Sequence, residues 1–147
     1  MTNPISFNLN FQKFENSINI SFAAGLHVIY GESGSGKSQF IYSLSGLKDE
    51  QESNFTFTNL VIPRSSQIVF QNPENQILSY TLESELAFAA ECQTIHSQDL
   101  QEKLALLKSD LPFINNWDRH PETLSGGQME MLNLVTAFST NPRLVLI

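Results

Sequence analysis

The chain has 147 residues, enough for one domain with a core of its own, and its charged fraction of 16% is that of an ordinary globular protein. Its formal net charge of −7 argues against broad binding to nucleic acid, which needs basic patches. The single cysteine, Cys92, excludes a disulfide framework within the chain and favours a reducing compartment. We find no signal peptide and no apolar run approaching about 18 residues, so we expect a cytoplasmic protein.

The N-terminal part has the pattern of a small β section followed by a buried strand and a helix. Apolar and polar residues alternate over residues 5–11 and again over residues 18–22, which predicts two half-buried strands. The polar turn between them favours antiparallel pairing. The short apolar run Leu26–Tyr30 predicts a fully buried strand. A helix that ends near Gly46 should follow, with an apolar stripe of Phe40, Ile41, Leu44 and Leu47.

A helical block occupies the middle of the chain. Residues 68–70 predict a short buried strand before it. Thr81 should open a helix whose first turn carries Glu83 and Glu85, where the helix dipole favours anions. Its apolar face is Leu82, Leu86 and Ala89 or Ala90. Ser97 can cap a second helix, whose apolar residues are Leu100, Leu104 and Leu107.

One more helix and one more strand complete the pattern. The helix begins at Ser125 or Gly126, and residues 144–147 form an apolar strand. Inside the helix we expect Met131, Leu134, Val135 and Phe138. The order of elements indicates an α/β fold with helices inserted into the middle of the chain.

The stretch VIYGESGSGKSQF, residues 28–40, carries the spacing G-x-x-x-x-G-K-[ST] of a phosphate-binding loop. Its glycines allow positive φ and close approach to a phosphate, and its N–H groups lie at the start of a helix. Lys37 supplies a positive charge, and the Ser38 hydroxyl can ligate Mg²⁺. The alternative is a glycine-serine turn with an accidental lysine, which the preceding strand and following helix disfavour. The candidate nucleotide-binding residues are Gly31, Glu32, Ser33, Gly34, Ser35, Gly36, Lys37, Ser38 and Gln39.

A second motif narrows the class, because kinases, GTP switches and transport ATPases all use such a loop. The segment Leu124-Ser125-Gly126-Gly127-Gln128 places a hydroxyl and bare N–H groups at a helix start. Here the chain resembles the ATP-binding-cassette (ABC) family, whose signature is LSGGQ. The resemblance implies that this segment contacts the γ-phosphate of ATP bound to an opposite subunit. The alternative is an ordinary N-cap by Ser125 followed by a Gly-Gly turn.

The third element is Gln71, which follows the strand at residues 68–70 and lies between the two motifs. The resemblance implies that Gln71 reaches toward Mg²⁺ and the attacking water and couples the nucleotide to transport subunits. The sequence QNPENQ…TLESELAFA is similar to the corresponding segment of the ATPase subunits of energy-coupling-factor importers. The family implies a P-loop NTPase fold, an ABC-type nucleotide-binding domain. We divide it into residues 1–74 (N-terminal antiparallel β section and P-loop core), 75–124 (inserted helical subdomain) and 125–147 (signature helix and following strand).

Several features depart from the family pattern. The family has an aromatic residue before the loop that stacks on adenine. No tyrosine occurs in residues 1–29, although Phe11 or Phe14 could take that role. Gln39 stands where a small hydroxyl residue is usual, and Glu130 puts an acid near the signature, which weakens anion binding. The strand at 144–147 stops before the aspartate and glutamate that the family uses for Mg²⁺ and as general base. The switch histidine that follows in the family is also absent, and His27, His96 and His120 do not replace it.

We therefore expect this chain alone to bind nucleotide better than it hydrolyses it, since general-base help is worth about 10²–10⁴-fold. The chain is expected to be a fragment that is incomplete at its C-terminus, or part of a split or degenerate cassette. The leading hypothesis is an ATP- and Mg²⁺-dependent subunit that pairs with a second ABC ATPase subunit and energises transmembrane transporter subunits at the inner face of the membrane. One alternative is a nucleotide-binding regulatory module without hydrolysis. Another is a soluble cassette protein of DNA repair or translation, which the acidic balance disfavours.

Overall fold

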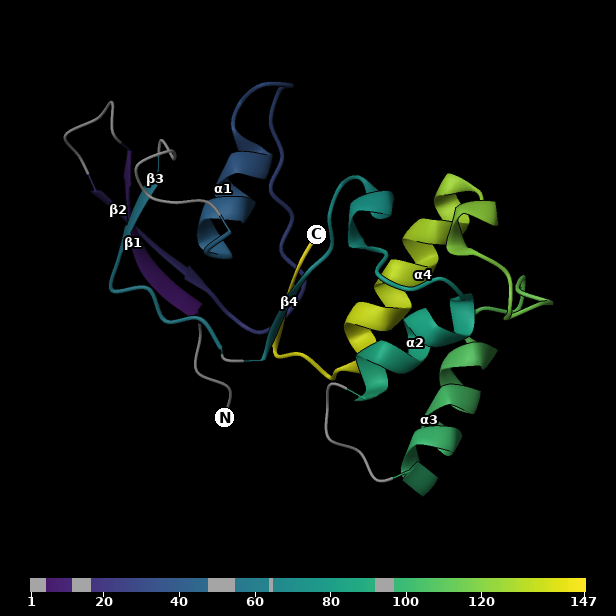
Figure 1. Ribbon diagram of the computed structural model, residues 1–147. Coiled ribbons are helices and arrows are strands. Elements are labelled where there is room, and N and C mark those ends of the chain that lie inside the picture. Colours follow the sequence, from purple (N-terminus) through teal and green to yellow (C-terminus); the bar gives the residue numbers. More distant parts are fainter. Residues whose placement is uncertain (1–4, 12–16, 48–54, 64, 92–96) are drawn as a thin grey trace. The chain divides into compact units, whose positions relative to one another are not determined.

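The computed structural model describes residues 5–11, 17–47, 55–63, 65–91 and 97–147 (Figure 1). The chain divides into two compact units, residues 1–64 with Leu146 and residues 65–145 with Ile147. The first unit holds the glycine-rich loop. The second holds Gln71 and the Leu124–Gln128 segment.

A three-stranded antiparallel sheet forms the base of the first unit. It consists of β1 (Ile5–Phe11), β2 (Ser17–Phe22) and β3 (Phe55–Thr58), in the order β2-β1-β3. Phe7 lies opposite Ile20 of β2, and Leu9 lies opposite Phe57 of β3. Phe7 and Leu9, two alternating apolar residues of β1, are buried in the core. The predicted pair of antiparallel strands is confirmed.

The helix that follows the glycine loop, α1 (Lys37–Leu44), packs on this sheet through aromatic rings. The ring centroids of Phe40 and Phe55 lie 5.6 Å apart in an edge-to-face arrangement, as do those of Phe7 and Phe57 at 5.2 Å. Such pairs add to the free energy gained by burial. The helix ends at Leu44, two residues before the left-handed Gly46, which confirms the predicted end near Gly46. Leu47 lies beyond the helix and is exposed, so its predicted place in the apolar stripe is wrong.

The prediction of a buried strand over residues 26–30 is also wrong. These residues have no strand structure, and the side chains of Leu26 and Tyr30 are more than nine-tenths exposed. An apolar run becomes a buried strand only where neighbouring strands pair with its backbone N–H and C=O groups. Among the residues that the structure describes, no strand pairs with this run.

Three helices form the core of the second unit: α2 (Leu82–Glu91), α3 (Ser97–Ser109) and α4 (Gly126–Ser139) (Figure 1). Two short 3-10 helices, η1 (Pro73–Gln76) and η2 (Pro121–Thr123), lie before α2 and α4. The expected helix starts near Thr81, Ser97 and Ser125 are confirmed. The core is formed mainly by Leu82, Leu86, Leu104, Leu107, Leu111, Ile114, Leu124, Met129 and Leu132.

A two-stranded sheet of β4 (Ser66–Ile68) and β5 (Leu144–Leu146) accompanies the helices. Strand β5 confirms the predicted C-terminal strand. Strand β4 begins and ends two residues before the predicted segment 68–70, although Val69 is buried as expected. In the part of the chain that the structure describes, no helix is long and apolar enough to cross a bilayer.

The buried face of α4 differs from the predicted one. Met131 and Phe138 are about half exposed, whereas the buried residues are Met129, Leu132, Asn133, Thr136, Ala137 and Ser139. Three of the buried side chains are polar, and their hydroxyl or amide groups hydrogen-bond to backbone carbonyls. The predicted buried face was wrong because it was based on apolar residues alone, whereas the buried face also contains polar residues.

Candidate functional site

The sequence predicts positive φ at the three loop glycines, and the structure confirms this at two of them but not at Gly31. Gly34 and Gly36 adopt left-handed conformations, with φ of 80° and 91°, which L side chains rarely adopt. Ser35 N–H donates to the Glu32 carbonyl oxygen at 3.2 Å, which closes a tight turn inside the loop. The loop residues Gly31–Ser35 are exposed.

Steric room is limited at both ends of this loop. A Cβ atom on Gly31 would lie 2.9 Å from the Ser35 hydroxyl oxygen, and one on Gly36 would lie 3.4 Å from the Phe55 ring. The loop at Gly36 therefore lies close to the Phe55 ring of β3 in the same unit. Glycine suits position 36 for two reasons: it adopts a positive φ without strain, and it has no Cβ that would crowd the Phe55 ring.

Lys37 closes the loop from the helix side. Its Nζ donates to the carbonyl oxygens of Gly31 and Glu32, at 2.8 and 2.9 Å. These two bonds hold the ammonium group over the loop, because the lysine is the first residue of α1 and the two carbonyls lie at the loop's start. An ammonium group has three donors, so one remains for a ligand.

The N-terminus of α1 is suited to an anion. Gly36 is the N-cap and offers no side chain to the N–H groups of the first turn, which have no carbonyl partner within the helix. These N–H groups and the Lys37 ammonium provide donors and positive potential at one place. The Ser38 hydroxyl is exposed there. This donor set fits a phosphate, with Ser38 beside it as an oxygen ligand for Mg²⁺.

The predicted signature segment forms the start of α4 as a complete capping box. The Ser125 hydroxyl accepts a hydrogen bond from the Gln128 N–H at 3.4 Å, and Gln128 Oε1 accepts one from the Ser125 N–H at 3.0 Å. Ser125, Gly126 and Gly127 are exposed, whereas Leu124 is buried in the helical core. A Cβ atom on either glycine would meet nothing within 4 Å, so the fold itself does not require glycine there.

Gln71 is exposed, and hydrogen bonds fix the backbone on both sides of it. On its N-terminal side, the Phe70 N–H donates to Gln76 Oε1 at 3.2 Å, and Gln76 Nε2 donates to the Ile68 carbonyl oxygen at 3.4 Å. On its C-terminal side, the Asn72 side chain caps η1 by accepting from the Glu74 N–H. Gln71 thus lies between two anchored backbone positions.

Sequence reasoning missed Asn133, and it placed Glu85 in the first turn of a helix without predicting that it is buried. Asn133, fully buried in α4, donates from Nδ2 to the Pro73 carbonyl oxygen at 2.9 Å. Glu85, also buried, accepts from the N–H groups of Leu78 and Ser79 through Oε2, at 2.9 and 2.8 Å. Glu83 also lies next to a leucine and is partly exposed, so adjacency to an apolar residue does not single out Glu85. Nothing in the sequence pattern separates Asn133 from an exposed asparagine.

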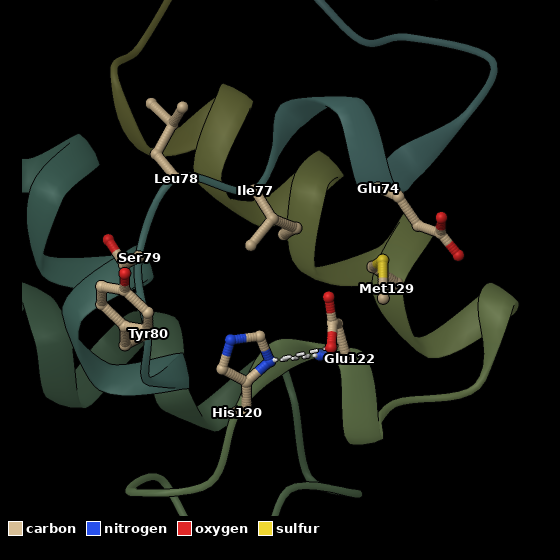
Figure 2. A pocket seen from close by; sticks show the side chains of 8 residues that line it. All are labelled: Glu74, Ile77, Leu78, Ser79, Tyr80, His120, Glu122 and Met129. Atoms are coloured by element: carbon tan, nitrogen blue, oxygen red, sulfur yellow. Dashed lines mark hydrogen bonds and ion pairs between the residues drawn. The ribbon is translucent and has the colours of Figure 1, made fainter.

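A hollow of about 240 Å³ opens between η1, the segment at residues 77–80, η2 and α4 (Figure 2). Its apolar lining comes from Ile77, Leu78, Tyr80 and Met129, and acidic Glu74 and Glu122 and the ring of His120 stand beside them. Tyr80 and His120 contact each other edge-to-face, with ring centroids 6.1 Å apart. Leu78 and Tyr80 are largely exposed, so the hollow offers an apolar surface with negative charge at its edge.

The remaining expected residues fall in three groups. Phe14, Cys92 and His96 lie outside the described residues, and the side chain of Phe11 is not among those described. His27 contacts the Ala23 carbonyl oxygen and the Phe22 ring, so it has a local structural role. His120 caps η2 through Nδ1, which accepts from the Glu122 N–H. Among the described residues no group of three or more His, Cys, Asp and Glu side chains could hold a metal ion.

Comparison with known proteins identifies the family. Residues 16–147 match the family described as ABC transporter. The chain is 33% identical over 141 residues to the energy-coupling factor transporter ATP-binding protein EcfA1 of Latilactobacillus sakei, a match that covers 90% of this chain and 50% of that protein. The EcfA1 protein of Staphylococcus epidermidis is 28% identical over 141 residues, with coverages of 90% and 52%. The chain thus spans about half the length of these relatives.

A solved structure shares the fold. The structure of cbiO1 from Clostridium perfringens, described as part of the ABC transporter complex cbiONQ, superposes with a TM-score of 0.70 at 20% identity. The match covers 97% of this chain and 62% of that one. It confirms the predicted α/β fold with an N-terminal antiparallel section and an inserted helical part. With the match over residues 16–147, these findings establish that the chain belongs to the ABC transporter family.

Proposed function

We propose that the chain is the ATP-binding part of a subunit that energises an ABC membrane importer of the energy-coupling-factor type. The observation that carries the proposal is the N-terminus of α1, where left-handed glycines, uncapped N–H groups and the Lys37 ammonium together provide a site for the phosphates of a nucleotide. The relatives whose names mention an energy-coupling factor transporter support the transport role.

In this proposal, residues 31–39 bind the phosphates of ATP. The backbone N–H groups and Lys37 would neutralise the negative charge of the phosphates. Ser38 and Gln71 would hold Mg²⁺ through their side-chain oxygens, and the ion would supply further positive charge beside the phosphates. The Ser125-Gly126-Gly127 face of α4 would receive the γ-phosphate held by a second ATPase subunit, so that two subunits close head to tail on two ATP molecules.

The second unit supplies the surface for the transmembrane subunits. The hollow beside Tyr80 and His120 has apolar walls and two carboxylates, Glu74 and Glu122, at its edge (Figure 2). That chemistry suits a short amphipathic segment with a basic residue. The subunit would then be peripheral on the inner face of the membrane, held there by its partners.

The decisive experiment is a calorimetric titration of the intact gene product with ATP, in the presence and in the absence of Mg²⁺. Saturable binding that strengthens with Mg²⁺ supports the proposal, and no uptake at the ATP concentrations found in cells overturns it. Co-purification tests the transport role separately. Recovery with membrane subunits supports the importer, whereas recovery with ribosomes or DNA contradicts it.

A further inference from the structure

A buried amide joins the signature helix to the turn that follows Gln71. Asn133 Nδ2 donates to the Pro73 carbonyl oxygen at 2.9 Å, across 60 positions of sequence. Because the Pro73 carbonyl can only accept, the nitrogen of the Asn133 amide must face it. Pro73 is the first residue of η1, so this bond fixes the start of the turn to α4.

The other end of the same turn is fixed to β4. The Gln76 amide accepts from the Phe70 N–H and donates to the Ile68 carbonyl oxygen. Gln71 is therefore the exposed residue between a backbone position held by Gln76 and a turn held by Asn133. The Asn133 link is the one that originates in α4, whose N-terminus is the signature segment.

Asparagine is energetically unfavourable at position 133. It lies in mid-helix, where asparagine has low propensity, and its side chain is fully buried. Within the described part of the chain its Oδ1 is buried with no hydrogen-bond partner, which destabilises the fold. Leucine has nearly the same shape and would avoid that cost. The link to Pro73 is the property that leucine lacks.

We propose that Asn133 is a positioning residue, which holds the turn Asn72–Gln76 and through it the placement of Gln71. The inference rests on the proposed function, in which Gln71 reaches Mg²⁺ and the attacking water. It adds to that function a fixed mechanical connection between the helix that begins with the signature and the residue that contacts the metal.

The test compares Asn133→Leu, Gln71→Ala and the double variant in the complete gene product with its partner subunit. Asn133→Leu should lower kcat by about tenfold to a hundredfold through misplacement of Gln71, with KM for ATP little changed. In the double variant the effect on kcat should be no larger than that of Gln71→Ala alone, because both changes act at the same place. Fully additive losses would mean that Asn133 acts elsewhere and would overturn the inference.

A second measurement does not depend on turnover. In the ligand-free protein, Asn133→Leu should speed amide hydrogen exchange in a peptide spanning residues 70–77 without a comparable change at the N-terminus of α4. Ser139→Ala is the matched control, because Ser139 is buried in the same helix and its hydroxyl donates only to the Thr136 carbonyl oxygen. Unchanged exchange in residues 70–77 contradicts the proposed link.

The two proposals fail in different ways. If the wild-type protein with its partner neither binds Mg·ATP nor hydrolyses it, the proposed function is wrong and this inference falls with it. If the wild type hydrolyses ATP and the double variant is additive, only the inference is wrong. Asn133→Ser replaces Asn133→Leu if the leucine variant fails to fold, since serine is too short to reach Pro73.

Discussion

Ser125 and Gln128 hydrogen-bond each other reciprocally at the start of α4, each side chain accepting from the other's backbone N–H. The first and last polar residues of the signature are thus engaged in stabilising their own helix. A capping box of this kind satisfies two of the backbone donors that a helix leaves unpaired. The predicted contact with a partner's phosphate has to coexist with this cap, which gives a way to separate the two roles.

Two substitutions at Ser125 should separate capping from phosphate binding. Ser125→Ala removes the cap and should lower the free energy of unfolding by about 1 kcal/mol, while Ser125→Asp keeps the cap and loses little stability. Both should abolish ATP-dependent association with the second subunit, since alanine lacks the hydroxyl and aspartate repels the phosphate. Urea unfolding and analytical ultracentrifugation with Mg·ATP measure the two effects. Wild-type association by Ser125→Asp would contradict the phosphate contact.

A second prediction concerns Lys37. Lys37→Ala should weaken ATP binding about 10- to 100-fold or more, because hydrogen bonds to charged groups are worth about 1.5–3 kcal/mol. Stability should change little, since the two bonds to Gly31 and Glu32 are exposed. Calorimetric titration measures the affinity. Arg143→Ala is the control: it removes an exposed positive charge in the other unit, and it should leave ATP affinity unchanged.

Glu85 and Glu83 make a matched pair on one turn of α2. Glu85 is buried and accepts two backbone N–H groups, so Glu85→Ala should lower the free energy of unfolding by about 1–3 kcal/mol. Glu83 is partly exposed and pairs with Lys108 at 2.7 Å, and the loss of such a pair costs about 0–1 kcal/mol. Unfolding followed by far-UV circular dichroism avoids the effect of Lys108 on the nearby Trp117 ring. Equal losses for both variants would show that the Glu85 bonds contribute little.

The residues that the sequence predicted well are those whose demands are local. Gly34 and Gly36 need only the backbone φ of their own loop, and Ser125 caps the helix that begins at the next residue. The strand at residues 26–30 was predicted wrongly because a strand depends on neighbours, which no hydropathy pattern contains. Asn133 was missed because its partner, Pro73, lies 60 positions away. The α4 face was misplaced for a related reason, since polar residues can be buried when backbone carbonyls receive their donors.

Two glycines in the two motifs should respond to alanine in opposite ways. Gly36 has φ of 91° and a Phe55 ring atom 3.4 Å from the site of a Cβ, so Gly36→Ala should destabilise the first unit by about 1–2 kcal/mol. Gly127 lies in the first turn of α4 with nothing within 4 Å of a Cβ. Gly127→Ala should therefore stabilise that helix by about 0.5–1 kcal/mol.

The Gly127→Ala variant should lose ATP-dependent association with the second subunit although it gains stability. A methyl group at residue 127 covers the exposed N–H face that the proposal assigns to the partner's γ-phosphate, so ATP-dependent association should fall although stability rises. Urea unfolding and sedimentation with Mg·ATP measure the two quantities on the same preparation. A Gly127→Ala protein that is more stable and still associates normally would show that the glycine is not needed for phosphate approach. Loss of both stability and association would point instead to a structural role that the open surroundings of Gly127 do not explain.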